Sequence, residues 1–150
     1  MRHLVISLLL VLFISSSMCE KKTFTFKSTE NGALESLNVK VGDEVEITLD
    51  ENPTTGYQWM IPEYEEGYNY IWSLKESTYT SAPNQSGMVG VGGKRTFILN
   101  VNLTGNEIVT FVYGRPWLYP QAIQQYNATG VFDASIMEGI AIQLELKSTS

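Results

Sequence analysis

The 150-residue chain has very few of the residues that most catalytic and metal sites need. It holds one cysteine, Cys19, and one histidine, His3. Both belong to a segment in which a charged start leads into the apolar run 4–14 and then into serines, the order of a secretory signal peptide. The run is shorter than the roughly 20 residues of a membrane-spanning helix. We expect residues 1–19 to be removed, leaving a mature domain of residues 20–150.

Loss of Cys19 and His3 excludes several classes of function. A lipid-modified Cys19 is the alternative, but Met18 is bulky where such a signal needs a small residue. The mature domain then has no disulfide, so a hydrophobic core must hold it together. It can form no Ser–His–Asp triad, no Cys–His pair and no zinc site with His or Cys ligands. We predict that the protein is not an enzyme and binds no metal and no cofactor.

Basic residues are scarce as well. Without Arg2, 9 lysines and arginines face 16 aspartates and glutamates, a net charge of −7. An acidic domain without basic clusters argues against nucleic acid and anionic membranes as partners. We therefore predict no nucleic acid, and no membrane for the mature form.

The acidic residues do not suggest a catalytic site. Glu63, Glu65 and Glu66 lie close together, and we interpret them as a solvated loop rather than as part of a carboxylate pair for glycoside hydrolysis. Asp50 and Glu51 lack the spacing of a calcium loop. We expect both to be the solvated flank of a turn.

Helical periodicity is almost absent, whereas alternation with a period of two recurs along the chain. The expected strands cover residues 23–28, 43–49, 57–61, 70–76, 94–103, 107–113 and 139–147, with a further short strand at 37–41. This pattern predicts an all-β fold, an immunoglobulin-like antiparallel β-sandwich of seven or eight strands. Trp59 is expected in its core.

Three connections carry unusual sequence: residues 50–56, 77–93 and 114–138. In an antiparallel sandwich, alternate connections emerge at the same end. We therefore expect these three to lie side by side and to form one composite binding edge.

The first of these connections contains "NPTTG". Pro53 fixes its own φ, Gly56 permits a left-handed backbone, and Thr54 and Thr55 are stiff at χ1. Such a loop is ordered before it binds and suits insertion into a crevice.

The third connection begins with "YGRPW" at the end of a strand. Arg115 and Trp117 are residue types that dominate binding hot spots. The alternative is that Trp117 folds back on the sandwich and Arg115 makes a surface ion pair.

Three motifs, "NPTTGYQW", "MVGVGG" and "YGRPW", occur in this order on these three connections. Together they resemble the chagasin family, protein inhibitors of papain-like cysteine peptidases built on an immunoglobulin-like sandwich, over residues 23–147. The resemblance implies reversible inhibition by a wedge, with Thr54 and Thr55 over the catalytic cysteine and the other two loops gripping the cleft. The peptidase-binding residues that it implies are Asn52, Pro53, Thr54, Thr55, Gly56, Tyr57, Gly90, Val91, Gly92, Gly93, Arg115, Pro116 and Trp117.

The sequence departs from the compact family pattern in two connections, 77–93 and 114–138, which are long. Long loops are uncommon without function or disorder, and the added residues can supply contacts to a particular peptidase or to a second one. A carbohydrate-binding sandwich, with Trp117, Tyr119 and Tyr79 as a stacking platform, is one rival hypothesis. An adhesion module without inhibitory activity is another.

The expected signal peptide places the protein in the secretory pathway, either secreted or retained in lysosome-like or phagosomal compartments. Three asparagines stand in glycosylation sequons: Asn84, Asn102 and Asn127. We expect a glycan at Asn84 or Asn127, which lie in long loops.

Overall fold

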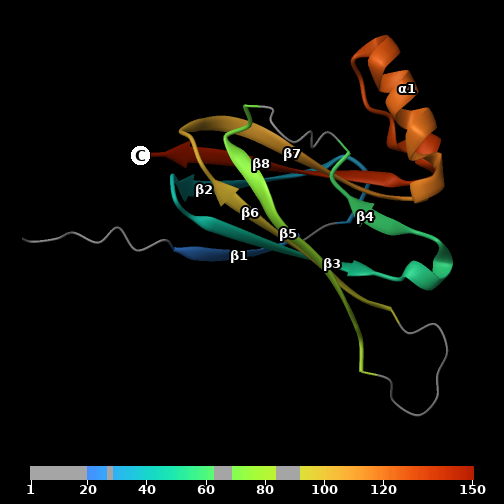
Figure 1. The fold of residues 1–150 in the computed structure, drawn as a ribbon, viewed down its shortest axis with the longest axis horizontal. Helices are drawn as coiled ribbons and strands as arrows, with labels where there is room; N and C mark the ends of the chain where they lie inside the picture. The colour runs from blue at the N-terminus through green and yellow to red at the C-terminus, as the bar shows by residue number, and fades with distance from the viewer. Residues whose placement is uncertain (1–19, 27–28, 63–68, 84–91) are drawn as a thin grey trace, which may run out of the picture.

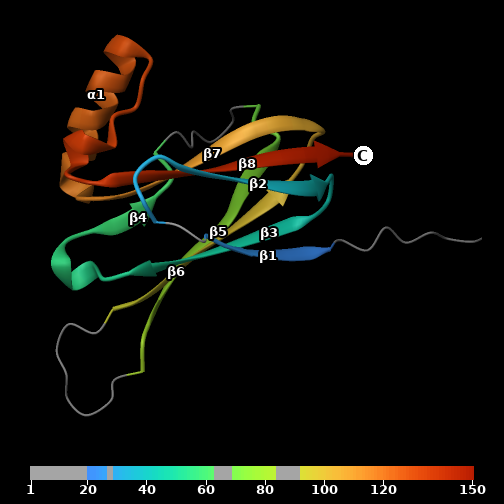
Figure 2. The same ribbon diagram turned by 180° about the vertical axis from the view of Figure 1, so that it is seen from behind.

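The computed structural model describes residues 20–26, 29–62, 69–83 and 92–150. In these parts of the chain, eight strands form two four-stranded sheets that pack against each other (Figures 1 and 2). The first sheet has the order β1 (Lys21–Thr25), β3 (Glu44–Glu51), β6 (Gly93–Val101) and β5 (Trp72–Ser81). The second has the order β2 (Ala33–Lys40), β8 (Ile140–Thr149), β7 (Gly105–Gly114) and β4 (Gln58–Met60). The predicted sandwich is confirmed.

Two of the strand pairs differ from the antiparallel pattern that we expected. β1 pairs in parallel with β3, and β2 pairs in parallel with β8, whereas the other pairs are antiparallel. The reason is that β1 and β2 follow each other along the chain but lie at the edges of different sheets, so no hairpin joins them. The chain therefore switches sheets before its central strands begin.

The core follows from the alternation of the strands. Val45, Ile47 and Leu49 of β3 are buried, and their polar neighbours point away from the core. Phe111 of β7 is fully buried and contacts the ring of Phe97 in the opposite sheet and that of Phe26, which follows β1. Trp59 of β4 is buried as predicted, and its indole N–H donates to the carbonyl of Asp50 at 2.8 Å.

The connection between β7 and β8 is helical, which the sequence analysis did not predict. It consists of the 3₁₀ turn η2 (Pro116–Leu118), the helix α1 (Tyr119–Thr129) and the 3₁₀ turn η3 (Ala134–Met137). Pro120 stands in the first turn of α1, where its missing N–H costs nothing, and Gly130 ends the helix with a φ of 71°. These are ordinary start and stop signals.

A small second core holds this helical connection on the sandwich. Val112 of β7, Ala122 of α1, and Ala134 and Met137 of η3 are buried together. Tyr119 adds a hydrogen bond from its hydroxyl to the carbonyl of Pro62. The extension of this connection, residues 115–139, is therefore a packed unit.

Within the described ranges, no helix is long and apolar enough to cross a membrane.

Candidate functional site

The described parts of the three unusual connections lie at one end of the sandwich, away from the C-terminus (Figures 1 and 2). The first, between β3 and β4, contains the 3₁₀ turn η1 (Pro53–Thr55). We call residues 52–57, 92–93 and 115–117 the three-loop edge. The predicted residues Gly90 and Val91 lie outside the described residues.

The η1 loop is held rigid by its own hydrogen bonds. The backbone N–H of Thr55 donates to the carbonyl of Asn52 at 3.1 Å, and that of Gly56 donates to the carbonyl of Pro53 at 2.9 Å. The hydroxyls of Thr54 and Thr55 also donate to Asn52, at 2.7 and 2.6 Å. Both threonines remain exposed. The loop is therefore a rigid turn with a neutral tip.

A buried carboxylate supports this loop from below. Glu51, the last residue of β3, is 2% exposed. It accepts a hydrogen bond from the backbone N–H of Trp59 at 2.7 Å and forms an ion pair with Arg95 of β6 at 2.8 Å. The prediction that Glu51 is a solvated turn flank is wrong, because it shares the inward face of β3 and finds charged and polar partners there. Asp50 faces outward and is exposed, as predicted.

The "YGRPW" segment presents its two large side chains as a stack. The guanidinium carbon of Arg115 lies 5.0 Å from the centroid of the Tyr57 ring and 5.3 Å from that of Trp117. Its Nε is 2.6 Å from a carboxylate oxygen of Glu138. Hydrogen bonding to the side chain of Tyr57, together with the charge of Glu138, raises the pKa of Arg115. The guanidinium of Arg115 is therefore held against Tyr57 of the first loop and Trp117 of its own loop.

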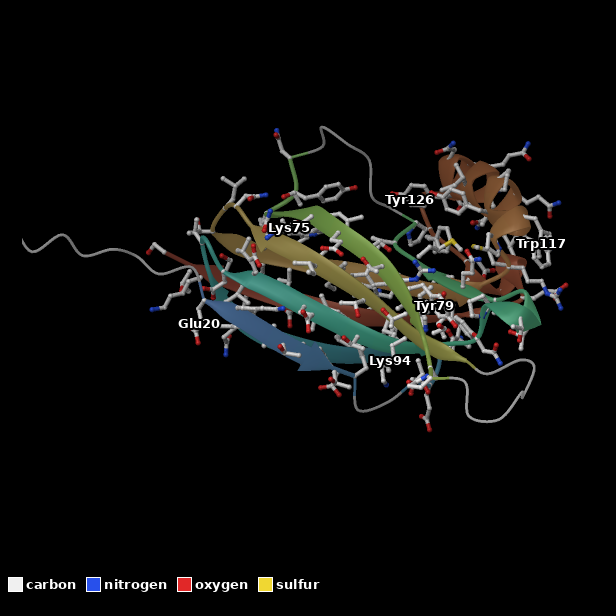
Figure 3. All side chains as sticks on the ribbon, turned by 60° about the horizontal axis from the view of Figure 1, so that its bottom comes forward. Glu20, Lys75, Tyr79, Lys94, Trp117 and Tyr126 are labelled. Carbon is white, nitrogen blue, oxygen red and sulfur yellow. The ribbon has the colours of Figure 1, made fainter. Side chains whose placement is uncertain are left out.

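Trp117 does not fold back into the core. Its side chain is 58% exposed and lies at the end of the molecule beside the base of α1 (Figure 3). The alternative of a core tryptophan is therefore wrong, whereas the ion pair of Arg115 is present beside the stack.

The first and third loops touch at a glycine. Gly56 has a φ of 83°, a conformation that residues with a side chain rarely adopt. A Cβ built on it would lie 2.8 Å from Cη2 of Trp117. The indole ring therefore packs against a position that only glycine fits without a shift.

The second connection reaches the same edge through β6. A Cβ on Gly92 would lie 3.0 Å from the carbonyl oxygen of Glu51 and 3.4 Å from Cβ of Asn52. The described part of the second loop therefore abuts the first, and the first abuts the third. The predicted juxtaposition of the three connections is confirmed for their described residues.

The chemistry of the three-loop edge is that of a binding surface. Its tip carries uncharged side chains, and Arg115 is its one charged residue in the described ranges. Among the residues that the structure describes, no group of His, Cys, Asp and Glu side chains is arranged to hold a metal.

Sequence reasoning missed the residues beneath the edge. Glu51 was expected to be a solvated turn flank, and Glu138 and Tyr113 were not singled out. The ring of Tyr113 packs at a tilt against those of Trp59 and Tyr57, with centroid distances of 5.0 and 5.5 Å. Its hydroxyl accepts a hydrogen bond from the backbone N–H of Asn52 at 3.3 Å. The alternation of β3 did place Glu51 on the inward face, so that signal was available.

Comparison with known proteins identifies the family. Residues 38–129 match the chagasin family peptidase inhibitor I42. The chain belongs to the chagasin family. Chagasin of Trypanosoma cruzi is 40% identical over 94 residues, which cover 60% of this chain and 79% of chagasin. Amoebiasin-1 of Entamoeba histolytica is 32% identical over 89 residues, which cover 59% of this chain and 81% of the relative.

Solved structures of chagasin-like proteins share the fold. The crystal structure of a cysteine protease inhibitor from Entamoeba histolytica has a TM-score of 0.60 and 26% identity, covering 88% of this chain and 98% of that one. Leishmania mexicana ICP has a TM-score of 0.52 and 26% identity, covering 81% and 93%. The predicted class of function, a protein inhibitor of cysteine peptidases and not an enzyme, is thereby confirmed.

Proposed function

We propose that this chagasin-family protein inhibits papain-like cysteine peptidases reversibly, by inserting the η1 loop into the active-site cleft. Thr54 and Thr55 lie over the catalytic cysteine in this arrangement. The segments around Gly92 and Trp117 contact the walls of the cleft on either side.

One observation carries the proposal: three segments far apart in sequence form a continuous, preformed surface. Gly92 packs on Asn52, and Trp117 packs on Gly56, so the exposed threonines stand between the other two loops. A surface that is rigid before binding loses little conformational entropy on association. Trp and Arg side chains at such an edge are the usual hot-spot residues.

Non-covalent contact between the two protein surfaces can supply the affinity that tight inhibition needs. An interface of standard size buries about 1,600 Å² in total, and nanomolar binding needs about −12 kcal/mol. The three-loop edge has no cysteine or histidine, so we expect no stable covalent bond with the peptidase. Inhibition should reverse when the complex is diluted or the inhibitor is competed away.

The rival carbohydrate-binding hypothesis finds no platform among the described residues. Tyr119 is half-buried and tied to Pro62, and Tyr79 stacks with Arg95 on the first sheet. Of the three proposed aromatic residues, Trp117 is the one that is mostly exposed.

Titration of papain tests the proposed function. We expect inhibition with one-to-one stoichiometry and protection of the catalytic thiol from a small alkylating reagent. An unchanged rate of alkylation under full inhibition would show that the inhibitor binds outside the cleft. Recovery of an inhibitor cut between Thr54 and Gly56 would instead identify a slow substrate.

Two substitutions test the wedge itself. Thr55→Arg forces a charged side chain into the cleft and should abolish inhibition of papain. Trp117→Ala should weaken inhibition by about 2 kcal/mol, or about 30-fold, without a large change in melting temperature. Leu103→Ala is the matched control, because Leu103 is similarly exposed but lies outside the three-loop edge. Equal effects of the two alanine variants would contradict the assignment of Trp117.

We also propose that the protein enters the secretory pathway by cleavage of residues 1–19 and carries N-linked glycan. Asn102 and Asn127 are exposed, while Asn84 lies outside the described residues. The side chain of Asn102 donates to Ser73, so we expect the glycan at Asn84 or Asn127. A glycan at Asn127 would cover part of α1. N-terminal sequencing and mass spectrometry of protein secreted by a glycosylating host test this. A glycan at Asn52 would contradict both the sequon rule and the wedge.

A further inference from the structure

We propose that α1 is an additional peptidase-binding surface, which extends the three-loop edge beyond the cleft and selects among papain-like peptidases. The inference rests on the proposed function. The occupant of the helix face is the surface of the same cysteine peptidase next to its cleft.

The first observation is continuity. η2, which contains Trp117, runs directly into α1 without an intervening loop. In Figures 1 and 2 the helix continues the line of η1 and η2 along the same end of the molecule. A peptidase that contacts the indole ring of Trp117 therefore meets the first turns of α1 next.

The second observation is a stripe of exposed side chains that follows Trp117 in the sequence. Within α1, successive residues are about 100° apart, so Gln121, Gln124 and Ala128 share one side of the helix, and Trp117 lies just before its first turn. All four are exposed, whereas Ala122 on the other side is fully buried. Figure 3 shows Tyr126 on the side of the helix toward the sandwich, opposite Trp117.

The third observation is the chemistry of this stripe. No charged residue occurs in residues 116–132, although 17% of the chain is charged. A solvated helix usually carries charged residues on its outer face, whereas charged residues are depleted at the centre of protein interfaces. Gln121 and Gln124 offer amide groups that donate and accept hydrogen bonds. The face fits a neutral polar surface and disfavours a peptidase that places an unpaired charge there.

The fourth observation is rigidity. α1 is held by the buried cluster around Val112 and Met137, and the backbone N–H of Arg115 donates to the carbonyl of Met137 at 3.0 Å. The helix is thus fixed relative to the three-loop edge. A second contact on a rigid frame adds to the first without a large entropic cost.

The double variant Gln121→Arg/Gln124→Arg tests the inference. Inhibition constants are measured for papain and several cathepsin-type peptidases, with circular dichroism to confirm the fold. We expect at least a tenfold loss of inhibition for one or more of the peptidases. The matched control, Asn38→Arg/Asn106→Arg, adds the same charge to exposed positions outside the edge and should change inhibition less than twofold.

Hydrogen exchange on the unmodified protein gives a second readout that does not depend on how the variant folds. Amides of α1 should exchange more slowly in the complex than in the free inhibitor, for each peptidase whose inhibition the double variant weakens. Unchanged exchange of α1 in every complex, with less than twofold effects across the panel, would overturn the inference. If Trp117→Ala and Thr55→Arg still abolish or weaken inhibition, the three-loop wedge stands without the helix. If Trp117→Ala and Thr55→Arg also leave inhibition unchanged, the proposed function itself is wrong.

Discussion

The η1 loop and the β7–β8 extension lie at the same end of the molecule but are held rigid in different ways. The loop is fixed by hydrogen bonds among residues 52–56 and by the buried carboxylate of Glu51. The extension is fixed by burial of apolar side chains under α1. The loop therefore depends on the identity of nearly every residue in it. The extension depends on a few inward residues, which leaves its outer face free to be fitted to a partner.

Glu51→Ala should remove the side chain that supports the η1 loop. Among these substitutions, we expect it to cause the largest loss of folding stability. It leaves Arg95 without its carboxylate and the backbone N–H of Trp59 without its acceptor. Removing one partner of a buried ion pair costs about 3 kcal/mol or more, which urea unfolding measures. Inhibition should weaken as well, because Asn52 directly follows the lost anchor.

Asp50→Ala is the control for that variant. Asp50 is paired with Lys94 on the exposed side of the same strand, where an ion pair contributes about 0–1 kcal/mol. Similar losses for the two variants would mean that Glu51 is no special anchor of the loop.

Met137→Ala should break the extension and leave the loop intact. Met137 is fully buried, and truncation of a buried methionine costs about 2–5 kcal/mol. Because the second core is separate from the main one, we expect the loss to appear as faster hydrogen exchange in α1, with the amides of β3 unchanged. Inhibition should fall at least to the level of the helix-face variant, because Arg115 and Trp117 belong to the same extension.

Val131→Ala serves as the control, since this side chain is 64% exposed in the same connection. If Met137→Ala instead speeds exchange evenly in both sheets, the extension and the sandwich form one cooperative unit and the comparison fails.

The same contrast explains what the sequence could predict. Alternation with a period of two marks a strand that is buried on one face, so residues such as Val45 and Leu99 indicated the sandwich directly. The motif "NPTTG" indicated a rigid loop because its proline, threonines and glycine restrict the backbone locally. Both signals lie within a few neighbouring residues.

The remaining features depend on residues that are distant in sequence. α1 has one buried residue, Ala122, and its partners Val112 and Met137 come from other elements, so its own sequence shows only a weak helical stripe. Glu51 looked solvated because its partner Arg95 is 44 residues away. The parallel pairing of β1 and β2 depends on which sheet each strand joins.

Asp133→Asn should have the smallest effect on stability of these substitutions, and this effect should be confined to the extension. Asp133 precedes η3, and its carboxylate accepts a hydrogen bond from the backbone N–H of Ser135 at 2.9 Å. Hydrogen bonding to Ser135 lowers the pKa of Asp133 below its ordinary value of 3.8. The ionised carboxylate therefore stabilises the folded extension above that value, and the contribution is lost as the pH falls through the folded-state pKa.

Asparagine keeps the shape of the cap but never carries the charge, so it isolates this contribution. The difference in unfolding free energy between the unmodified protein and Asp133→Asn should be present near pH 6 and shrink as the pH falls through the folded-state pKa of Asp133. Asp50→Asn, in an exposed ion pair outside the extension, is the matched comparison. The decisive readout is hydrogen exchange, in which η3 and the end of α1 should open faster in the Asn variant near pH 6 while the η1 loop stays unchanged. A change in the η1 loop of the same size would show that the two ways of holding the edge are coupled.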